Sequence, residues 1–312
     1  MKKVSLSLLT ASVAVSAMLT LPHAPMIQAK EETLNDQVQE LSRGTSWEKL
    51  DQIDLQFDVF HPQGMTKVGD LYFMSSVEII EGTTRYEQPI DGYDRSPGKG
   101  KGHLFVFNEQ GELLEDIELG EGDMYHPGGI DYDGKFIWVP VAEYRPNSES
   151  IVYKVNAETL EVEEAFRADD HIGGIVKNDK SQKLHGVSWG SRLFYEWNHK
   201  GKQLNVEDNP SHFVDYQDCE STGNGQMICS GITNLPNPAN NNSFQLGGLA
   251  LLDLKNNDIL HEVPVTELSP KGNVITRNPV FLEKAEEEIK LYAVPDDDDA
   301  SLLIYQTTNL SK

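Results

Sequence analysis

The sequence predicts an all-β protein, a five-bladed β-propeller closed by an N-terminal strand, with one short N-terminal helix. Short runs of alternating apolar and polar residues are separated by Gly, Asn, Asp and Pro, which is typical of antiparallel strands. An internal repeat is the second observation, and its five copies begin at His61, His126, His171, Asp218 and Arg277. Each copy supplies two strands and continues into further short strands, and four strands per unit at this period indicate propeller blades.

The fifth copy lacks an outer strand, because its last apolar run, residues 301–307, supplies only a third strand. The N-terminal segment can complete this blade, since Ile53, Leu55 and Phe57 alternate with polar residues. A ring closed in this way leaves no open sheet edge. A two-sheet sandwich is the alternative architecture, but it would not explain the repeated four-strand unit.

The first 29 residues have the pattern of a secretory signal peptide. Two lysines precede an apolar run, and a plausible cleavage site follows at Ala29. A membrane anchor is the alternative, but serine and threonine residues interrupt the apolar run. We therefore expect a secreted or otherwise extracytoplasmic protein, with no membrane insertion once the signal peptide is removed.

Residues 30–46 are expected to form a helix and a linker, and residues 47–309 a single propeller domain. Leu34, Val38 and Leu41 share one face of the predicted helix, and a threonine and an aspartate form a capping pair at its start. This is the one convincing helical pattern in the chain.

Acidic residues dominate the charge of the chain. Lys and Arg number 26 and Asp and Glu number 50, which gives a net charge of -24. Removal of the predicted signal peptide would leave 24 positive charges against 50 negative ones. Such a chain repels phosphate backbones, which argues against a nucleic-acid partner.

The two cysteines, Cys219 and Cys229, are symmetric about a turn at Asn224. They should therefore lie opposite each other across a hairpin. Two cysteines cannot build a cysteine-only zinc site. In an oxidising compartment we expect a disulfide between them, and reduced thiols are the alternative.

Several strings resemble a known family: HPQGM, HPGGIDYDGKFIWVPVAEYRP, HIGGI followed by LHGVSWGS, and DYQDC. They are similar to an uncharacterised family of exported bacterial β-propellers, a domain of unknown function. The resemblance covers nearly all of the mature chain and implies the propeller fold without an activity. More distantly, the architecture is similar to gluconolactonase-like and strictosidine-synthase-like propellers, which hold a metal in the central channel. Those families use Glu, Asn and Asp as ligands, whereas the inner strands here begin with His, so their ligands do not carry over.

The first strand of each propeller blade lines the central channel, so His61, His126 and His171 should face one another at one mouth. Glu78 lies 17 residues after His61, and Glu143 lies 17 residues after His126, each pair being symmetric about a turn. Each of these two histidines is therefore expected to have a glutamate as its cross-strand neighbour. An imidazole beside a carboxylate suits a metal ligand or a general base.

The remaining blades are expected to contribute further side chains to the same mouth: Asp218 or Gln217, Arg277 or Asn278, and Trp189 opposite His171. Arg277 could bind an anionic group through its planar fork of donors. Segments 81–102 and 234–248 follow second strands, so both should rise over this face. The acidic run 296–299 is interpreted as a solvated turn rather than a calcium loop. Glycines that follow the histidines indicate crowding near the axis: Gly64, Gly128, Gly129, Gly173 and Gly174.

The leading hypothesis is a secreted propeller that binds a small polar or anionic ligand at the channel mouth, with a divalent metal ion held by His61, His126 and His171. If the protein is an enzyme, metal-assisted hydrolysis fits best, with Glu78 or Glu143 accepting a proton. The competing hypothesis is a non-catalytic module for a cell-surface glycan or a protein partner. A purely structural role for the histidines, as donors to backbone carbonyls, is a further alternative.

Overall fold

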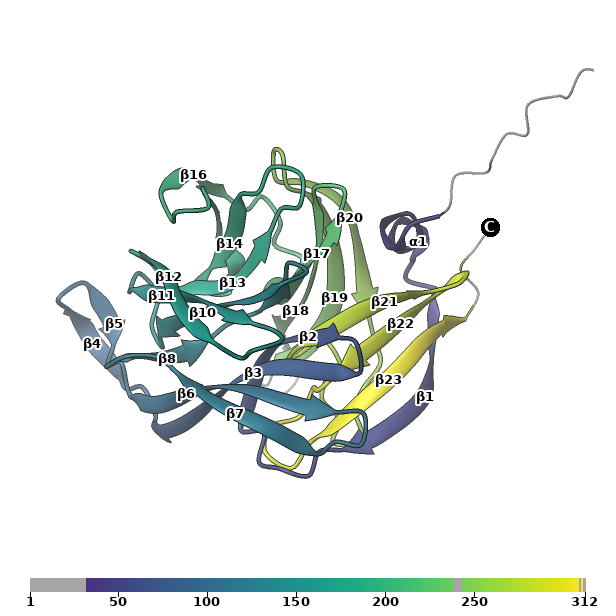
Figure 1. Cartoon of the computed structure of the whole chain (residues 1–312), viewed down its shortest axis with the longest axis horizontal. Coiled ribbons are helices and arrows are strands. Elements are labelled where there is room, and N and C mark those ends of the chain that lie inside the picture. The colour runs from purple at the N-terminus through teal and green to yellow at the C-terminus, as the bar shows by residue number, and fades with distance from the viewer. Residues whose placement is uncertain (1–31, 238–242, 309, 311–312) are drawn as a thin grey trace, which may run out of the picture. The chain divides into compact units, whose positions relative to one another are not determined.

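Five antiparallel sheets surround a central axis in the computed structural model, which describes residues 32–237, 243–308 and 310 (Figure 1). The first strands of the blades contact one another, so they are innermost. Blade 1 consists of β2 (His61–Val68), β3 (Leu71–Glu81), β6 (Lys99–Asn108) and β7 (Leu113–Leu119). Blade 2 consists of β8 (Met124–Pro127) with β9 (Asp131–Tyr132), β10 (Phe136–Glu143), β11 (Ser150–Asn156) and β12 (Val162–Ala168). Blade 3 consists of β13 (Ile172–Lys177), β14 (Leu184–Ser188), β15 (Leu193–Trp197) and β16 (Gln203–Asp208). Blade 4 consists of β17 (Asp215–Gly223), β18 (Gln226–Pro236), β19 (Ser243–Asp253) and β20 (Asp258–Val265). Blade 5 consists of β21 (Val280–Ala285), β22 (Glu288–Ala293), β23 (Ser301–Thr308) and β1 (Ser46–Asp54). The predicted five-bladed propeller is confirmed.

The ring closes through β1, which pairs antiparallel with β23 and completes blade 5 as predicted. The strand begins at Ser46, seven residues before Ile53, and it ends at Asp54. Leu55 and Phe57 were expected in this strand, but they follow it. Both instead pack into the apolar cluster between blades 5 and 1. They belong to the core because the chain turns there from the outer strand of one blade towards the inner strand of the next.

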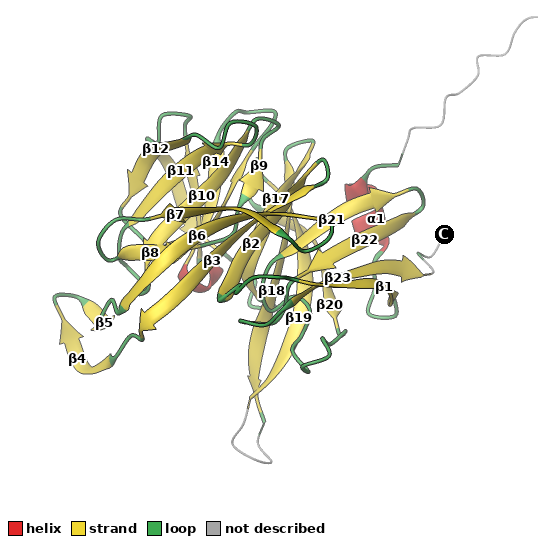
Figure 2. Ribbon diagram, turned by 60° about the horizontal axis from the view of Figure 1, so that its bottom comes forward, coloured by secondary structure: helices red, strands yellow, loops and turns green. Residues whose placement is uncertain are grey.

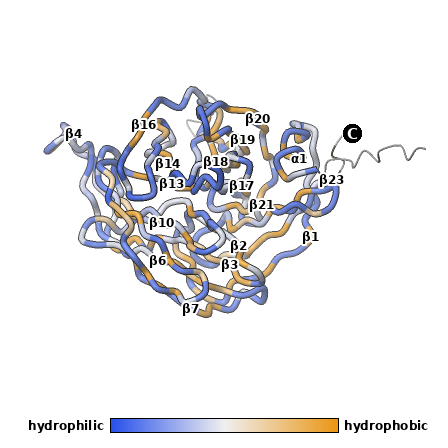
Figure 3. Tube along the Cα trace, turned by 45° about the horizontal axis from the view of Figure 1, so that its top comes forward, coloured by the Kyte–Doolittle hydropathy of each residue, from blue (hydrophilic) through white to orange (hydrophobic). Residues whose placement is uncertain are grey.

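Buried apolar clusters fill the interfaces between neighbouring blades, and the described residues form one cluster at each of the five interfaces. In Figure 3 the hydrophobic stretches lie mainly along the strands, and the connecting turns are mostly hydrophilic. Each sheet therefore buries both of its faces against its neighbours. The result is a rigid scaffold whose connecting loops can hold functional side chains in place.

The short helix α1 (Leu34–Glu40) packs against blades 4 and 5. Its N-terminus carries the predicted capping box, since the Thr33 hydroxyl accepts from the backbone N–H of Asp36 and the Asp36 carboxylate accepts from the backbone N–H of Thr33. Val38 and Leu41 are buried in the apolar cluster between these two blades. The helix therefore covers the interface between blade 4 and blade 5, the blade that closes the ring.

The inner strands approach one another so closely that the axis is filled by backbone. The backbone N–H of Gly129 in blade 2 donates to the carbonyl of Gly173 in blade 3 at 2.9 Å. A Cβ atom on Gly64 would lie 2.5 Å from a backbone nitrogen of blade 2, and one on Gly128 would lie 2.4 Å from a carbonyl oxygen of blade 3. Crowding is thus confirmed at Gly64, Gly128 and Gly129. A Cβ on Gly173 or Gly174 would meet only ordinary contacts.

Asp218 is a buried strut at this axis, although the sequence placed it among the ligand-binding residues. One carboxylate oxygen accepts from the backbone N–H of Met65 in blade 1 at 2.8 Å, and the other accepts from Ile130 in blade 2 at 3.1 Å. Burial raises the pKa of Asp218 well above its ordinary value. Its side chain therefore joins three blades and does not line the cavity described below.

Two further carboxylates join inner strands in the same way. Asp131 in blade 2 accepts from backbone N–H groups of Lys177 in blade 3 and Ser221 in blade 4. Glu220 in blade 4 accepts from Leu282 in blade 5 at 2.9 Å. Burial raises the pKa of Asp131 to about 7, and it raises that of Glu220 well above its ordinary value. Protonation relieves the cost of burying these groups so close together.

The predicted disulfide between Cys219 and Cys229 is present. The two residues are direct partners on β17 and β18, and their Cα atoms are 4.1 Å apart. The predicted signal peptide, residues 1–29, lies outside the described residues. None of the described helices is long and apolar enough to cross a membrane.

Candidate functional site

A cavity of about 210 Å³ lies at the mouth of the axis, where inner strands begin and second strands end. Inner strands of blades 1 to 4 and the loops after second strands supply its lining: His61, Gln63, His126, Tyr144, His171, Gly173, Ser188, Trp189, Gly190, Asp215, Tyr216 and Gln217. The structure thus brings the three predicted histidines and Trp189 together. The cavity is small for a ligand pocket, so it suits a small molecule.

Glu78 and Glu143 are not the cross-strand neighbours of His61 and His126, because the inner strands of blades 1 and 2 carry bulges. His61 pairs with Val77 instead of Glu78, and the register shifts next to Pro62. In blade 2 His126 pairs with Ala142 instead of Glu143. A shift of one residue turns a side chain to the opposite face of its strand. The predicted cross-strand pairs are therefore wrong.

Neither glutamate lines the cavity. The carboxylate of Glu78 lies 3.8 Å from Nε2 of His103 in the body of blade 1. The carboxylate of Glu143 is hydrogen-bonded to the guanidinium of Arg145. Both carboxylates thus have partners away from the cavity, which removes the geometric basis for the proton-accepting role that the sequence predicted for them.

His126 is a buried imidazole without a hydrogen-bond partner. Its side chain is among the lining groups, the residue is 5% exposed, and neither ring nitrogen has a partner among the described residues. The ring of Tyr144 stacks on it at 4.2 Å between centroids. Burial, with a smaller contribution from the other two histidines, lowers the pKa of His126 well below its ordinary value. His126 is therefore neutral at pH 7, with one donor and one acceptor to satisfy.

His171 is also neutral, but one of its nitrogens is satisfied. Nδ1 donates to the backbone carbonyl of Glu143 at 2.8 Å, which leaves Nε2 as an acceptor. Burial lowers the pKa of His171 to about 4. The ring of Trp189 contacts it edge-on, with 4.7 Å between the centroids. The backbone contact is the structural role that the sequence left open for these histidines.

His61 has a carboxylate partner that comes from blade 5. Its Nδ1 lies 2.9 Å from Oδ1 of Asp297. Arg277 donates to both oxygens of Asp297, at 3.2 and 2.8 Å, and Asn278 donates to Oδ1 at 3.0 Å. Burial alone would raise the pKa of Asp297, but the hydrogen bonds from His61 and Arg277 outweigh it and hold that pKa well below its ordinary value. Arg277 is thus bound to a carboxylate of this chain and does not line the cavity.

Asp297 was not among the predicted site residues, because the run 296–299 was interpreted as a solvated turn. Its place in the loop after β22 could have indicated its role, since the corresponding loops of blades 2 and 3 supply Tyr144 and Trp189 to the same mouth. Asp296, the residue before it, instead accepts from Ser269 at 2.8 Å.

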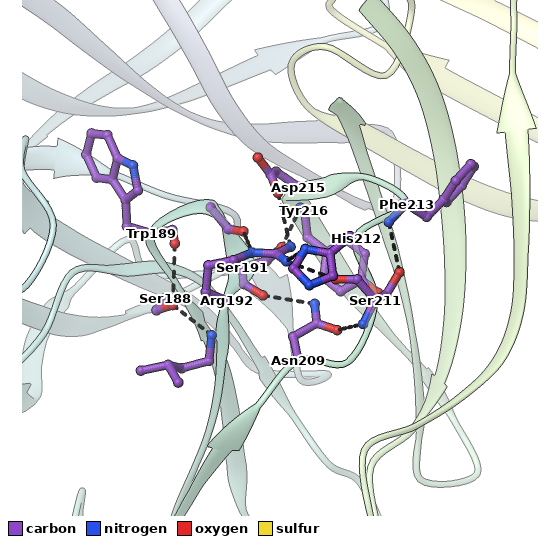
Figure 4. Close-up of polar contacts among 12 residues, drawn as sticks. Ser188, Trp189, Ser191, Arg192, Asn209, Ser211, His212, Phe213, Asp215 and Tyr216 are labelled. Atoms are coloured by element: carbon purple, nitrogen blue, oxygen red, sulfur yellow. Dashed lines mark hydrogen bonds and ion pairs between the residues drawn. The ribbon is translucent and has the colours of Figure 1, made fainter. Parts of the chain in front are cut away.

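Arg192 fixes the loop that carries Trp189, a second feature that the sequence did not reveal. Its guanidinium donates to the carbonyl of Gly190 at 2.7 Å, to the carbonyl of Ser211 at 2.9 Å and to Asp215 at 3.1 Å. Figure 4 shows these contacts gathered on one side, with the indole of Trp189 directed away from them. The 3₁₀ turn Trp189–Ser191 is thereby tied to blade 4, which leaves the indole to form part of the cavity wall.

The two long segments project from the face predicted for them. Segment 81–102 contains the hairpin of β4 (Arg85–Ile90) and β5 (Tyr93–Arg95), and β18 and β19 extend as a second hairpin (Figure 2). The guanidinium of Arg95 lies 5.0 Å from the Trp189 ring centroid. Residues 238–242 of segment 234–248 lie outside the described part of the chain. The first hairpin therefore reaches the wall of the cavity.

The residues as they lie do not fit the divalent metal ion predicted at His61, His126 and His171. Within the described ranges, no group of three or more His, Cys, Asp or Glu side chains is placed to hold a metal ion. Nδ1 of His61 and Nδ1 of His171 contact protein oxygens, a contact that metal-ligating histidines also make, so it is the spacing of the side chains and not these contacts that argues against a metal ion. The cavity is lined by three histidines, Asp215, two glutamines, and hydroxyl-bearing and aromatic residues.

The chain belongs to the family of unknown function DUF6454, which matches residues 20–310. The predicted membership of an uncharacterised propeller family is thereby confirmed. Among curated proteins, none is similar to the chain in sequence.

Solved structures with a similar arrangement include the protein U3-55K, with 9% identity and a TM-score of 0.46 over 83% of this chain and 99% of that one. A luciferin-regenerating enzyme has 10% identity and a TM-score of 0.46 over 86% of this chain and 96% of its own. A member of the DUF4221 family from Bacteroides vulgatus has 10% identity and a TM-score of 0.38 over 86% and 99%. Similarities this distant say nothing about ligand or activity.

Proposed function

We propose that the protein binds a small, uncharged, hydroxyl-bearing ligand in the cavity at the channel mouth. The observation that carries the proposal is His126, a cavity-lining residue whose buried, neutral imidazole has no partner for either nitrogen among the described residues. A buried polar group without a partner costs about 1–3 kcal/mol, and a ligand that both donates and accepts would recover it. A hydroxyl group does both.

The charges around the cavity favour a neutral ligand over an anionic one. The guanidinium of Arg277 is paired with Asp297, and that of Arg192 is paired with Asp215. The two neutral histidines offer no positive charge. The strongly acidic chain would in addition repel an anion. Gln63 and Gln217 supply amide groups to the lining, which suit hydroxyls.

Matched neutral and anionic ligands test this proposal. Calorimetric titrations would use glucose, N-acetylglucosamine and glycerol beside glucose 6-phosphate and gluconate. Binding of a neutral compound, with weaker binding of its anionic counterpart, is expected. His126→Phe keeps a flat ring and removes both nitrogens, so it should weaken binding about tenfold or more. Gln217→Ala tests the same cavity should the first variant not fold.

His199→Phe is the matched control, because His199 is exposed and lies away from the cavity. It should leave the affinity unchanged. Stronger binding of the anions, or equal binding by the His126→Phe and wild-type proteins, would overturn the proposal.

A second candidate function is a module that binds a protein or a cell-surface glycan through the projecting hairpins. Exposed apolar side chains favour it: Ile80 is 60% exposed, and Ile90 and Phe244 are each 53% exposed. Deletion of residues 83–96 would abolish such binding and leave the cavity lining intact. Loss of ligand binding only in the His126 variant would favour the cavity.

We infer further that the protein acts outside the cytoplasm. The disulfide supports this location, because such bonds persist mainly in oxidising compartments. Comparison of the mass of the mature protein with the sequence would show whether residues 1–29 are removed.

A further inference from the structure

We propose that His61 is a general base of a hydrolytic site in this cavity, oriented by Asp297, and that the substrate is a small uncharged ester bearing hydroxyl groups. The inference rests on the proposed function, because the ester would occupy the same cavity. It replaces the glutamates and the metal ion that the sequence predicted with a histidine and an aspartate from two different blades.

The pairing of His61 with Asp297 fixes which nitrogen can accept a proton. Nδ1 lies 2.9 Å from Oδ1 of Asp297, so it carries the hydrogen and donates to the carboxylate. Nε2 is then left with its lone pair. Because His61 lines the cavity and Asp297 does not, the Nε2 edge is the part of the ring available to a bound molecule.

Asp297 is a positioning residue, and its own geometry is fixed from the far side. Arg277 and Asn278 donate three hydrogen bonds to its two oxygens. A carboxylate held in this way stays ionised, keeps the imidazole in one tautomer and stabilises the imidazolium once the ring has taken a proton. Among the described residues, His61 alone of the three cavity histidines has such a partner, since Nδ1 of His171 donates to a backbone carbonyl and no partner of His126 is found there.

The reaction balances with water as the only co-reactant. Nε2 of His61 takes a proton from water while the water oxygen forms a bond to the ester carbonyl carbon. The N–H of neutral His126 donates to the oxyanion that develops on the carbonyl oxygen. The bond from carbon to the leaving oxygen then breaks, and the proton passes from Nε2 to that oxygen. The products are a carboxylic acid and an alcohol, and His61 regains its starting state.

Hydrolysis of glycerol monoacetate by the mature protein tests the proposal, with acid release followed in a pH-stat in the presence of EDTA. Turnover above the buffer blank is expected. His61→Ala should lower kcat/KM by about 100-fold or more, which is the lower range for a general base. Asp297→Asn should lower kcat and leave KM nearly unchanged, because Asp297 acts through His61. His199→Ala should behave as the wild type.

Absence of turnover, loss of turnover on adding EDTA, or equal rates in the His61→Ala and wild-type proteins would overturn the proposal. The calorimetric titrations separate this failure from failure of the binding proposal. A wild-type protein that binds neutral ligands through His126 but does not hydrolyse the ester disproves the role of His61 alone. A protein that does neither disproves both.

Discussion

The buried carboxylate of Asp131 at the axis is expected to stabilise the folded protein more in acid than at pH 7. Burial raises the pKa of Asp131 to about 7, so the folded protein holds a proton that the unfolded chain releases above about pH 4. Its stabilising contribution is therefore present in acid and is lost as the pH rises towards 7. The free energy of unfolding of the wild type relative to Asp131→Asn should increase by up to about 1.4 kcal/mol per pH unit between pH 7 and 4.

Urea unfolding of both proteins at pH 7, 6 and 5 measures this difference. His126 and His171 act in the opposite sense, because their folded-state pKa values are lowered, and the subtraction removes their contribution. A difference that does not change with pH would show that Asp131 is ionised in the folded protein.

Asp218 should matter as a hydrogen-bond acceptor rather than as a charge. Asp218→Ala leaves the backbone N–H groups of Met65 and Ile130 without a partner, at a cost of about 1–3 kcal/mol each. Asp218→Asn keeps an acceptor and should cost less. Thermal unfolding of the two variants checks this order, and an alanine variant as stable as the asparagine variant would contradict the role of Asp218 as a strut.

Among the secondary-structure elements, helix α1 is expected to stabilise the propeller through its buried face. Leu41, which caps the C-terminus of α1, is 3% exposed in the cluster between blades 4 and 5. Leu41→Ala should lower the free energy of unfolding by about 2–5 kcal/mol, the usual range for a fully buried leucine. Leu50→Ala on β1 is the control, since Leu50 is 48% exposed and should change stability little. Urea unfolding compares them, and equal effects would show that α1 packs only loosely.

The sequence predicted the strands well because turn residues and alternation are local signals. It did not predict the bulges, since these depend on backbone contacts between blades: the chain next to Gly64 must fit against Ile130 of the following blade. One extra residue there separated His61 from Glu78. The three histidines nevertheless lie together at one mouth, as predicted, because their convergence follows from blade topology alone. Asp297 was missed because an exposed-looking acidic run gives no sign of a partner 236 residues away.

At the scale of the whole molecule, closure by β1 should hold the ring together. A variant that lacks the residues before Leu55 would lose both α1 and the partner of β23, which leaves the edge of that strand open. We expect self-association and a broad, uncooperative unfolding transition, measured by size-exclusion chromatography and calorimetry. A monomeric variant with wild-type cooperativity would contradict the role of the closing strand.

The most direct test of a ligand site at the channel mouth is NMR of the ring signals of labelled histidines during titration with pH and with the neutral ligands. We expect His126 to stay neutral well below pH 6.5 and its signals to shift on addition of a neutral hydroxyl compound, while those of His199 do not. A His126 that takes up a proton near pH 6.5, or that is unaffected by any ligand which binds the protein, would contradict this expectation.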